Sequence, residues 1–279
     1  MHLITHHPDC MWIKFENTTA IYRDPSYGKR IASALEARMR DSQPDAASFY
    51  NLASIYRQIA MFSRSGDESD DQGFLQYFGL PSNAVMPEKP DLKLAEKAVE
   101  YYRLAVSHVA TDSGYAGIYL GGLVKLLSSL ERYSEAVEAF ESSQPLPVGP
   151  SNAGLFLDYG LALYRSGNQI SAIRTLQEVR GIDNEGDGKP GHATMRAETA
   201  LGLIAMRGGN IPEAERYLMS SLDVERCPHN VTQGVPTRLG RKLLEAGNNG
   251  IVIEFCHAAL AKFNSDDSGI KQLLVEAQI

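Results

Sequence analysis

Residues 201–218 read LGLIAMRGGNIPEAERYL, and this stretch indicates the fold class more clearly than any other in the chain. Apolar side chains recur every three or four residues on both sides of Gly208, Gly209 and Asn210, which is the spacing of a helix that buries one face. A glycine after the first helix can take the left-handed conformation that ends it. Pro212 stands in the first turn of a second helix, where a backbone N–H would have no hydrogen-bond partner within the helix. The stretch therefore predicts a helical hairpin.

The same order of helix, short turn and helix recurs along the chain, at 120–140, 156–176 and 239–260. A further hairpin is predicted to be split, with 51–62 as its first helix and 94–106 as its second. Aligning the five second helices on one small residue selects Ala98, Ala136, Ala172, Ala214 and Val252, at intervals of 36 to 42 residues. A helical hairpin that repeats at such a period is typical of an α-solenoid, in which each hairpin covers the exposed face of its neighbour.

In the spacing of their small and bulky residues these hairpins resemble the tetratricopeptide repeat. The residues that carry the likeness in three hairpins are Leu123, Val124, Leu127, Ala136 and Phe140, then Tyr159, Gly160, Leu163, Ala172 and Leu176, then Leu201, Gly202, Ala205, Ala214 and Leu218. The chain departs from the family pattern at Glu198 and Pro236, where an aromatic residue is usual, and at Val252 and Cys256 in the fifth hairpin. The resemblance implies an all-α fold, a right-handed α-α superhelix of about five hairpins over residues 45–262.

The rest of the chain is expected to flank or interrupt this solenoid. Residues 1–44 are predicted to form an N-terminal segment with one helix and a short strand near 13–16, and 263–279 a capping helix. An acidic insertion with prolines and glycines, residues 63–90, separates the two helices of the split hairpin. Its composition predicts a mobile loop or a lid over one end of the solenoid. More loosely, 198–263 resembles bacterial tetratricopeptide-like proteins of unassigned function, which implies no activity.

Composition narrows the classes of partner. The chain has 279 residues, a formal net charge of −7 and three cysteines, an odd number that favours a reducing compartment over a disulfide framework. Its acidity disfavours nucleic acid and anionic membranes, which attract concentrated positive charge. The sequence shows neither the apolar core of a signal peptide nor the roughly 18 apolar residues of a membrane helix. A cytoplasmic protein is therefore expected.

Two motifs suggest ligand chemistry without meeting its requirements. GDGKPG at 186–191 matches the dinucleotide-binding pattern, but a predicted helix rather than a buried strand precedes it. The overlapping run DNEGDG at 183–188 begins like a calcium loop, yet Thr194 stands where the pattern needs a glutamate. The segment is therefore predicted to be a solvated loop between hairpins.

Cysteine and histidine near the end of the chain leave an alternative open. Cys227, His229, Cys256 and His257 offer the ligand types of a structural zinc site, although adjacent Cys256 and His257 diverge by about 100° on a helix. No set of nucleophile, base and orienting residue is recognisable, so we expect no enzyme, no metal and no cofactor. The alternative is a small enzyme or metal-dependent factor built on the insertion or on this Cys/His set.

The family resemblance also implies a binding site. In tetratricopeptide superhelices the first helices of the hairpins line a concave groove in which ligands usually dock. The positions that we carry over as the predicted partner-binding residues are Arg57, Lys125, Leu161, Tyr164, Arg165, Leu203, Met206, Arg207 and Arg241. Further groove positions, nearer the start of the same helices, add Ser54, Leu157 and Thr199.

Cations interleaved with apolar residues, in a chain that is acidic overall, favour a protein or acidic peptide as the partner. The alternative is that arginine and lysine keep a solvated wall soluble by pairing with neighbouring acids.

Overall fold

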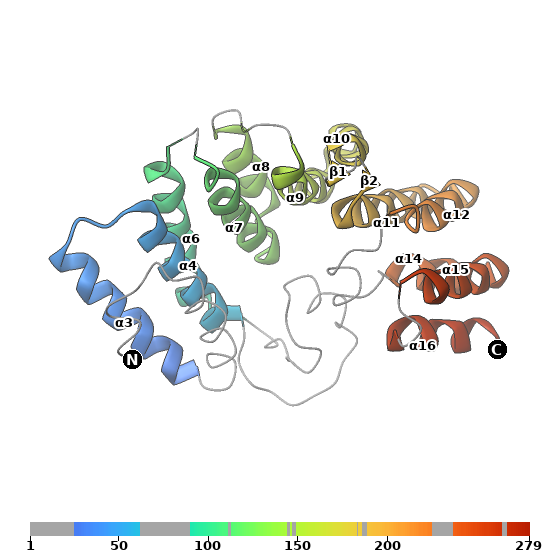
Figure 1. Cartoon of the computed structure of the whole chain (residues 1–279), viewed down its shortest axis with the longest axis horizontal. Coiled ribbons are helices and arrows are strands. Elements are labelled where there is room, and N and C mark those ends of the chain that lie inside the picture. Colours follow the sequence, from blue (N-terminus) through green and yellow to red (C-terminus); the bar gives the residue numbers. More distant parts are fainter. Residues whose placement is uncertain are drawn as a thin grey trace. The chain divides into compact units, whose positions relative to one another are not determined.

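The computed structural model describes residues 25–61, 90–110, 113–143, 146, 149–182, 184–185, 189–224, 237–263 and 267–279. Their regular secondary structure is helical apart from one two-residue antiparallel ladder, in which β1 (Asn184–Glu185) pairs with β2 (Lys189–Pro190). The predicted all-α class is confirmed (Figure 1). None of the described helices is long and apolar enough to span a membrane. The predicted strand near 13–16 and nearly all of the insertion 63–90 lie outside the described residues.

The chain divides into two compact units, and each is described by itself. The described helices of unit 1 are α3 (Pro25–Asp41), α4 (Ala46–Met61), α6 (Leu92–His108), α7 (Ala116–Ser129) and α8 (Tyr133–Glu141). α4 packs along α6 although about 30 residues separate them in sequence, as predicted for the split hairpin. α3 packs on α4, and α6 packs on α7, which forms a hairpin with α8. The helix predicted in the N-terminal segment is α3.

Unit 2 contains three tight hairpins and a last helix. Its described elements are η1 (Pro150–Asn152), α9 (Ala153–Arg165), α10 (Gln169–Ile182), β1, β2, α11 (His192–Arg207), α12 (Ile211–Ser220), α14 (Arg238–Glu245), α15 (Asn249–Lys262) and α16 (Ser268–Ala277). α9 pairs with α10, α11 with α12 and α14 with α15, while α16 packs on α14 and α15. Among the first helices, α11 contacts both α9 and α14. The β1–β2 ladder stands where the sequence predicts only a loop.

Each tight hairpin closes through the same turn. In unit 2 a glycine with positive φ follows each first helix: Gly167 at 94°, Gly209 at 74° and Gly247 at 82°. The next amide donates to the carbonyl five residues back, as Asn210 does to Ala205 over 2.9 Å. In the α7–α8 hairpin Glu131 takes the left-handed position, with φ 59°, and the same hydrogen bond forms after it. This is the Schellman end of a helix, which satisfies carbonyls that the helix leaves open.

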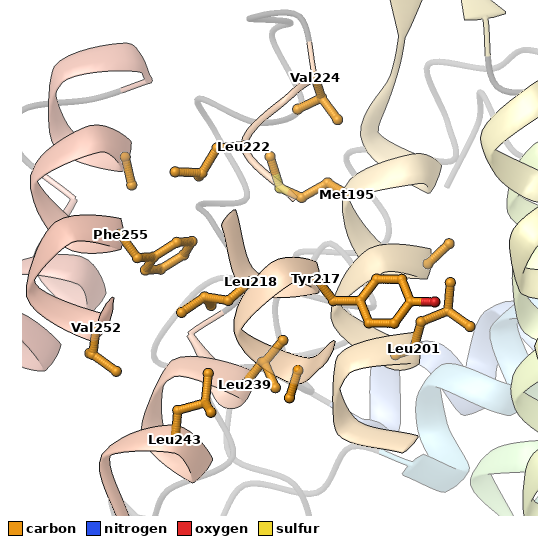
Figure 2. Close-up of a cluster of buried hydrophobic side chains, with 14 of the residues drawn as sticks. Met195, Leu201, Tyr217, Leu218, Leu222, Val224, Leu239, Leu243, Val252 and Phe255 are labelled. Carbon is orange, nitrogen blue, oxygen red and sulfur yellow. The ribbon is translucent and has the colours of Figure 1, made fainter. Parts of the chain in front are cut away.

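One apolar cluster holds unit 2 together. Figure 2 shows side chains from α11, α12, α14 and α15 gathered into it, together with Leu222 and Val224, which follow α12. Both units also bury the small residue on which the second helices align. Its exposed fraction is 0% at Ala98, Ala136, Ala172, Ala214 and Val252. A small buried residue at that point lets neighbouring helices approach closely.

Glycines mark the closest approaches between the helices of unit 2. A β-carbon on Gly160 would lie 3.0 Å from Cγ of Leu176 in the second helix of the same hairpin. A β-carbon on Gly202 would lie 3.1 Å from the β-carbon of Tyr217 and would also collide with Leu239 of the next first helix. Both glycines therefore stand where two helices approach closely.

Candidate partner-binding surface

The first helices of unit 2 bring most of the predicted partner-binding residues together. Leu161, Tyr164 and Arg165 come from the last two turns of α9, and Leu203, Met206 and Arg207 come from the matching part of α11. We call these six residues the α9–α11 surface. The two helices meet there through Arg207, whose Nη1 donates a hydrogen bond to the Tyr164 hydroxyl over 3.1 Å. The guanidinium carbon also lies 5.4 Å from the centre of the Tyr164 ring.

The apolar members of this surface are only half-buried. Leu161, Tyr164, Leu203 and Met206 pack on the edge of the unit 2 core cluster and keep part of their area in contact with solvent. An apolar strip of this kind can be covered by a peptide without disturbing the core below it. Its burial would supply affinity in proportion to the area removed from water.

The two arginines of this surface lack the ion pairs that several other arginines of the described chain make. Arg165 and Arg207 are exposed, and no carboxylate of the described residues forms an ion pair with either. Elsewhere in the described chain, ion pairs tie down the side chains of Arg103, Arg132, Arg174, Arg180 and Arg216. The charge of the α9–α11 surface is therefore positive and uncompensated, although the whole chain carries −7.

The other predicted cations are placed differently. Arg241 lies on α14, with its Nε 3.9 Å from a carboxylate oxygen of Glu276 on α16. Arg57 and Lys125 lie in unit 1, on α4 and α7, and each already has an interaction partner of its own. Within the described chain, the expected row of five equivalent cations therefore reduces to two arginines with no carboxylate partner.

Positions predicted nearer the start of each first helix do not face a ligand, and that part of the prediction is wrong. Leu157 is 0% exposed because it lies in the core cluster. Ser54 is buried and shares a hydrogen bond with the Tyr102 hydroxyl at 3.2 Å. Thr199 is buried and donates to the carbonyl oxygen of Met195 over 3.0 Å. Positions carried over from the family therefore fail where helices pack too closely to leave a surface.

A structural role for the two arginines must also be weighed. Arg165 and Arg207 both stand in the last turn of their helices, where positive charge interacts favourably with the helix dipole. That interaction is worth about 0.3–1 kcal/mol at an exposed site. The interaction with the dipole explains why each helix end tolerates a cation. It accounts neither for the contact between Arg207 and Tyr164 nor for the lack of a carboxylate partner in the described chain.

The Cys/His set does not form a metal site in the described chain. Cys256 lies in the core, and burial raises the pKa of its thiol to about 11. His257 points to solvent, so the two neighbours diverge as expected from helix geometry. Cys227 and His229 lie outside the described residues. Among the residues that are described, no group of three His, Cys, Asp or Glu side chains could hold a metal ion.

Unit 1 contains a polar cluster that the sequence did not predict. One carboxylate oxygen of Glu36, on α3, accepts hydrogen bonds from Tyr56 on α4 at 2.7 Å and from Lys97 and Tyr101 on α6, both at 3.1 Å. The Lys97 ammonium group also lies 4.9 Å from the centre of the Tyr56 ring. These contacts join residues of three helices that lie 20 to 65 positions apart in sequence, and no local motif signals them.

The electrostatics of this cluster favour a structural role. Burial alone would raise the pKa of Glu36, but the hydrogen bonds from Tyr56, Lys97 and Tyr101 outweigh it and lower that pKa. Burial and the charge of Glu36 raise the pKa of Tyr101 to about 12. A tyrosine that holds its proton so firmly is poorly suited to general acid–base chemistry near neutral pH. The cluster serves instead to fasten α3 to α4 and α6.

The structure explains why Glu198 departs from the repeat pattern. Its side chain is 1% exposed and forms an ion pair with Arg180 on α10, and it accepts a hydrogen bond from Ser220 on α12 over 2.9 Å. Burial raises the pKa of Glu198, and its two partners offset that effect only in part. The sequence drew attention to this residue, since a glutamate stands where an aromatic residue is usual. It gave no sign of the partners, Arg180 and Ser220.

Comparison with known proteins adds no relative. Neither protein-family models nor curated protein sequences produce a match to this chain. The α9–α11 surface is therefore interpreted from its own chemistry.

Proposed function

We propose that this protein is an interaction module that binds an acidic peptide, or an acidic segment of a protein, on the α9–α11 surface. The observation that carries the proposal is the pair of exposed arginines, Arg165 and Arg207, with no carboxylate partner in the described chain beside a half-buried apolar strip. Charges at the rim of such a surface mainly speed association and select the partner, while the apolar strip supplies most of the affinity.

We further propose that the hairpins form a right-handed superhelix resembling tetratricopeptide repeats, acting in the cytoplasm on a protein partner. Three observations support this architecture. The same left-handed turn closes each tight hairpin of the described chain. The small residue on which the second helices align is fully buried in all five of them. In unit 2, consecutive first helices contact one another.

A charge-reversal experiment tests the proposed function. The probe is a fluorescein-labelled peptide of alternating glutamate and leucine, and binding is followed by fluorescence anisotropy at several salt concentrations. We expect the full chain to bind it and the double variant Arg165→Glu, Arg207→Glu to lose at least tenfold in affinity. Because charges exposed to solvent are screened over about 8–10 Å, binding by the unaltered protein should weaken as salt rises.

The matched control carries the same change in net charge elsewhere. Arg40 is exposed in the last turn of α3 with no ion pair in the described chain, and Arg174 faces solvent from α10. The double variant Arg40→Glu, Arg174→Glu should bind the probe almost as well as the unaltered protein. Equal losses in the two double variants would mean that only the overall charge matters, and the proposal would fail.

A further inference from the structure

The contact between Tyr164 and Arg207 leaves hydrogen-bonding capacity unused on both side chains. The Tyr164 hydroxyl oxygen accepts from Nη1 of Arg207, so its own hydrogen is still available to an acceptor. No residue of the described chain accepts that hydrogen, and Nε and Nη2 of Arg207 also lack an acceptor there. The Tyr164 hydroxyl and the open Nε–Nη2 edge of Arg207 therefore lie on opposite sides of the guanidinium, and each keeps donors available.

Arg132 shows how an arginine of this chain pairs with a carboxylate through its Nε–Nη2 edge. Its Nε and Nη2 donate to the two carboxylate oxygens of Glu135, both at 2.6 Å. This two-pronged arrangement is the strongest pairing that an arginine makes with an acid. The same edge of Arg207 is open, and Tyr164 holds its guanidinium in place through a hydrogen bond and the ring contact. A side chain already held in position loses less entropy when it binds.

We propose that Tyr164 and Arg207 together form the acid-recognition point of the α9–α11 surface, and that they bind a glutamate or aspartate side chain of the peptide. The carboxylate accepts two hydrogen bonds from the open Nε–Nη2 edge of Arg207, while Tyr164 holds the guanidinium in place from its Nη1 side. Arg165, next to Tyr164 in the sequence, adds charge without fixing the geometry. This inference rests on the proposed function and adds a positioning role for Tyr164 that its half-buried, partly apolar character does not suggest.

Two conservative variants test the geometry while keeping the charge and the fold. Tyr164→Phe keeps the ring but removes the hydroxyl, and Arg207→Lys keeps the charge but removes the planar edge. With the glutamate–leucine peptide as probe, we expect each to weaken binding about tenfold, because each loses hydrogen bonds to a charged group. Salt dependence should remain close to that of the unaltered protein, since neither variant changes the charge of the surface.

The controls separate this inference from the proposed function. Tyr115→Phe removes the hydroxyl of an exposed tyrosine in unit 1 and should leave affinity unchanged. Tyr164→Phe and the unaltered protein should bind a peptide with glutamine in place of glutamate with the same affinity. If Tyr164→Phe binds as tightly as the unaltered protein while the Arg165, Arg207 reversal still abolishes binding, the recognition point is overturned and the proposed function stands. If the unaltered protein does not prefer glutamate to glutamine, both are overturned.

Discussion

Each unit of this protein surrounds one glutamate with hydrogen-bonding partners, and the pKa values of the two carboxyl groups shift in opposite directions. In unit 1, Glu36 receives three hydrogen bonds at a partly hydrated junction, and its pKa falls below the usual value. In unit 2, Glu198 is almost completely buried with two partners, and its pKa rises. The comparison shows that the pKa of a carboxyl group falls where the hydrogen bonds that it accepts outweigh its loss of hydration. The pKa rises where they do not.

The cations of the two units differ in a parallel way. In unit 1, Arg103 and Arg132 converge on Glu135, and Arg132 reaches Glu96 as well, so ion pairs at the surface join α6 to the α7–α8 hairpin above a close contact between Tyr102 and Gly122. In unit 2 an apolar cluster with close approaches at glycines holds the first helices together. Exposed arginines such as Arg165 are therefore not needed for packing there and are available to a partner.

The largest expected effect tests whether close packing holds unit 2. Replacing Gly202 with leucine should lower the free energy of unfolding by about 1–3 kcal/mol, because the new side chain must displace Tyr217 or Leu239. Chemical denaturation followed by circular dichroism measures it.

Gly121 on α7 is the matched control in unit 1, since a β-carbon there would meet no atom within 4 Å. Gly121→Ala should raise the free energy of unfolding by about 0.5–1 kcal/mol through helix propensity alone. Destabilisation at Gly121 as large as that at Gly202 would show that overlap with Tyr217 and Leu239 is not what destabilises Gly202→Leu.

Next in size is the opposite pH dependence of the two glutamates. The pKa of Glu198 is above 4.5 in the folded protein, so the folded state binds a proton more readily than the unfolded chain. Relative to a Glu198→Gln variant, the unaltered protein should become less stable as pH rises from 4.5 through that raised pKa. Urea denaturation of both proteins across this pH window measures the difference.

Glu36 should show the reverse sign. Its pKa is below 4.5 in the folded protein, so its contribution is present above that pH and is lost as pH falls through the lowered pKa. Relative to Glu36→Gln, we expect this loss of stability to be small, since the junction is partly hydrated. If both glutamates changed the stability in the same direction as pH rises, the contrast between the units would be wrong.

The smallest effect concerns the turn that unit 1 makes without glycine. Glu131 takes a left-handed conformation that costs about 1 kcal/mol for a residue with a β-carbon. Glu131→Gly should therefore stabilise the protein by up to about 1 kcal/mol, less the greater freedom of glycine in the unfolded chain. Gly209→Ala should destabilise by a similar amount at the equivalent turn. A differential scanning calorimeter resolves both shifts.

Sequence periodicity predicted the hairpins because each helix buries one face and each turn needs a particular backbone. The pairing of α4 with α6 could be predicted across the insertion because residues 51–62 and 94–106 carry complementary apolar faces. The Glu36 cluster could not, since it depends on where α3 docks. Nothing in the spacing of Glu36, Tyr56 and Lys97 reveals that docking.

The candidate site was predicted only in part, for a similar reason. Repeat positions located Tyr164, Arg165 and Arg207, because helix ends recur with the period. They misplaced Leu157, because how closely two first helices approach is set by packing on all sides. Whether an arginine is paired depends on which acids the fold brings near it, and that information is not local in the sequence.

The shared turn limits how this chain can change its length. Since the tight hairpins of the described chain end through one hydrogen-bond pattern, the chain leaves each first helix in the same direction. Duplicating or deleting a whole hairpin keeps every turn and every buried face matched to a neighbour, whereas half a hairpin leaves one apolar face uncovered. Length variants that still fold should therefore differ in steps of about 40 residues, because whole hairpins are gained or lost.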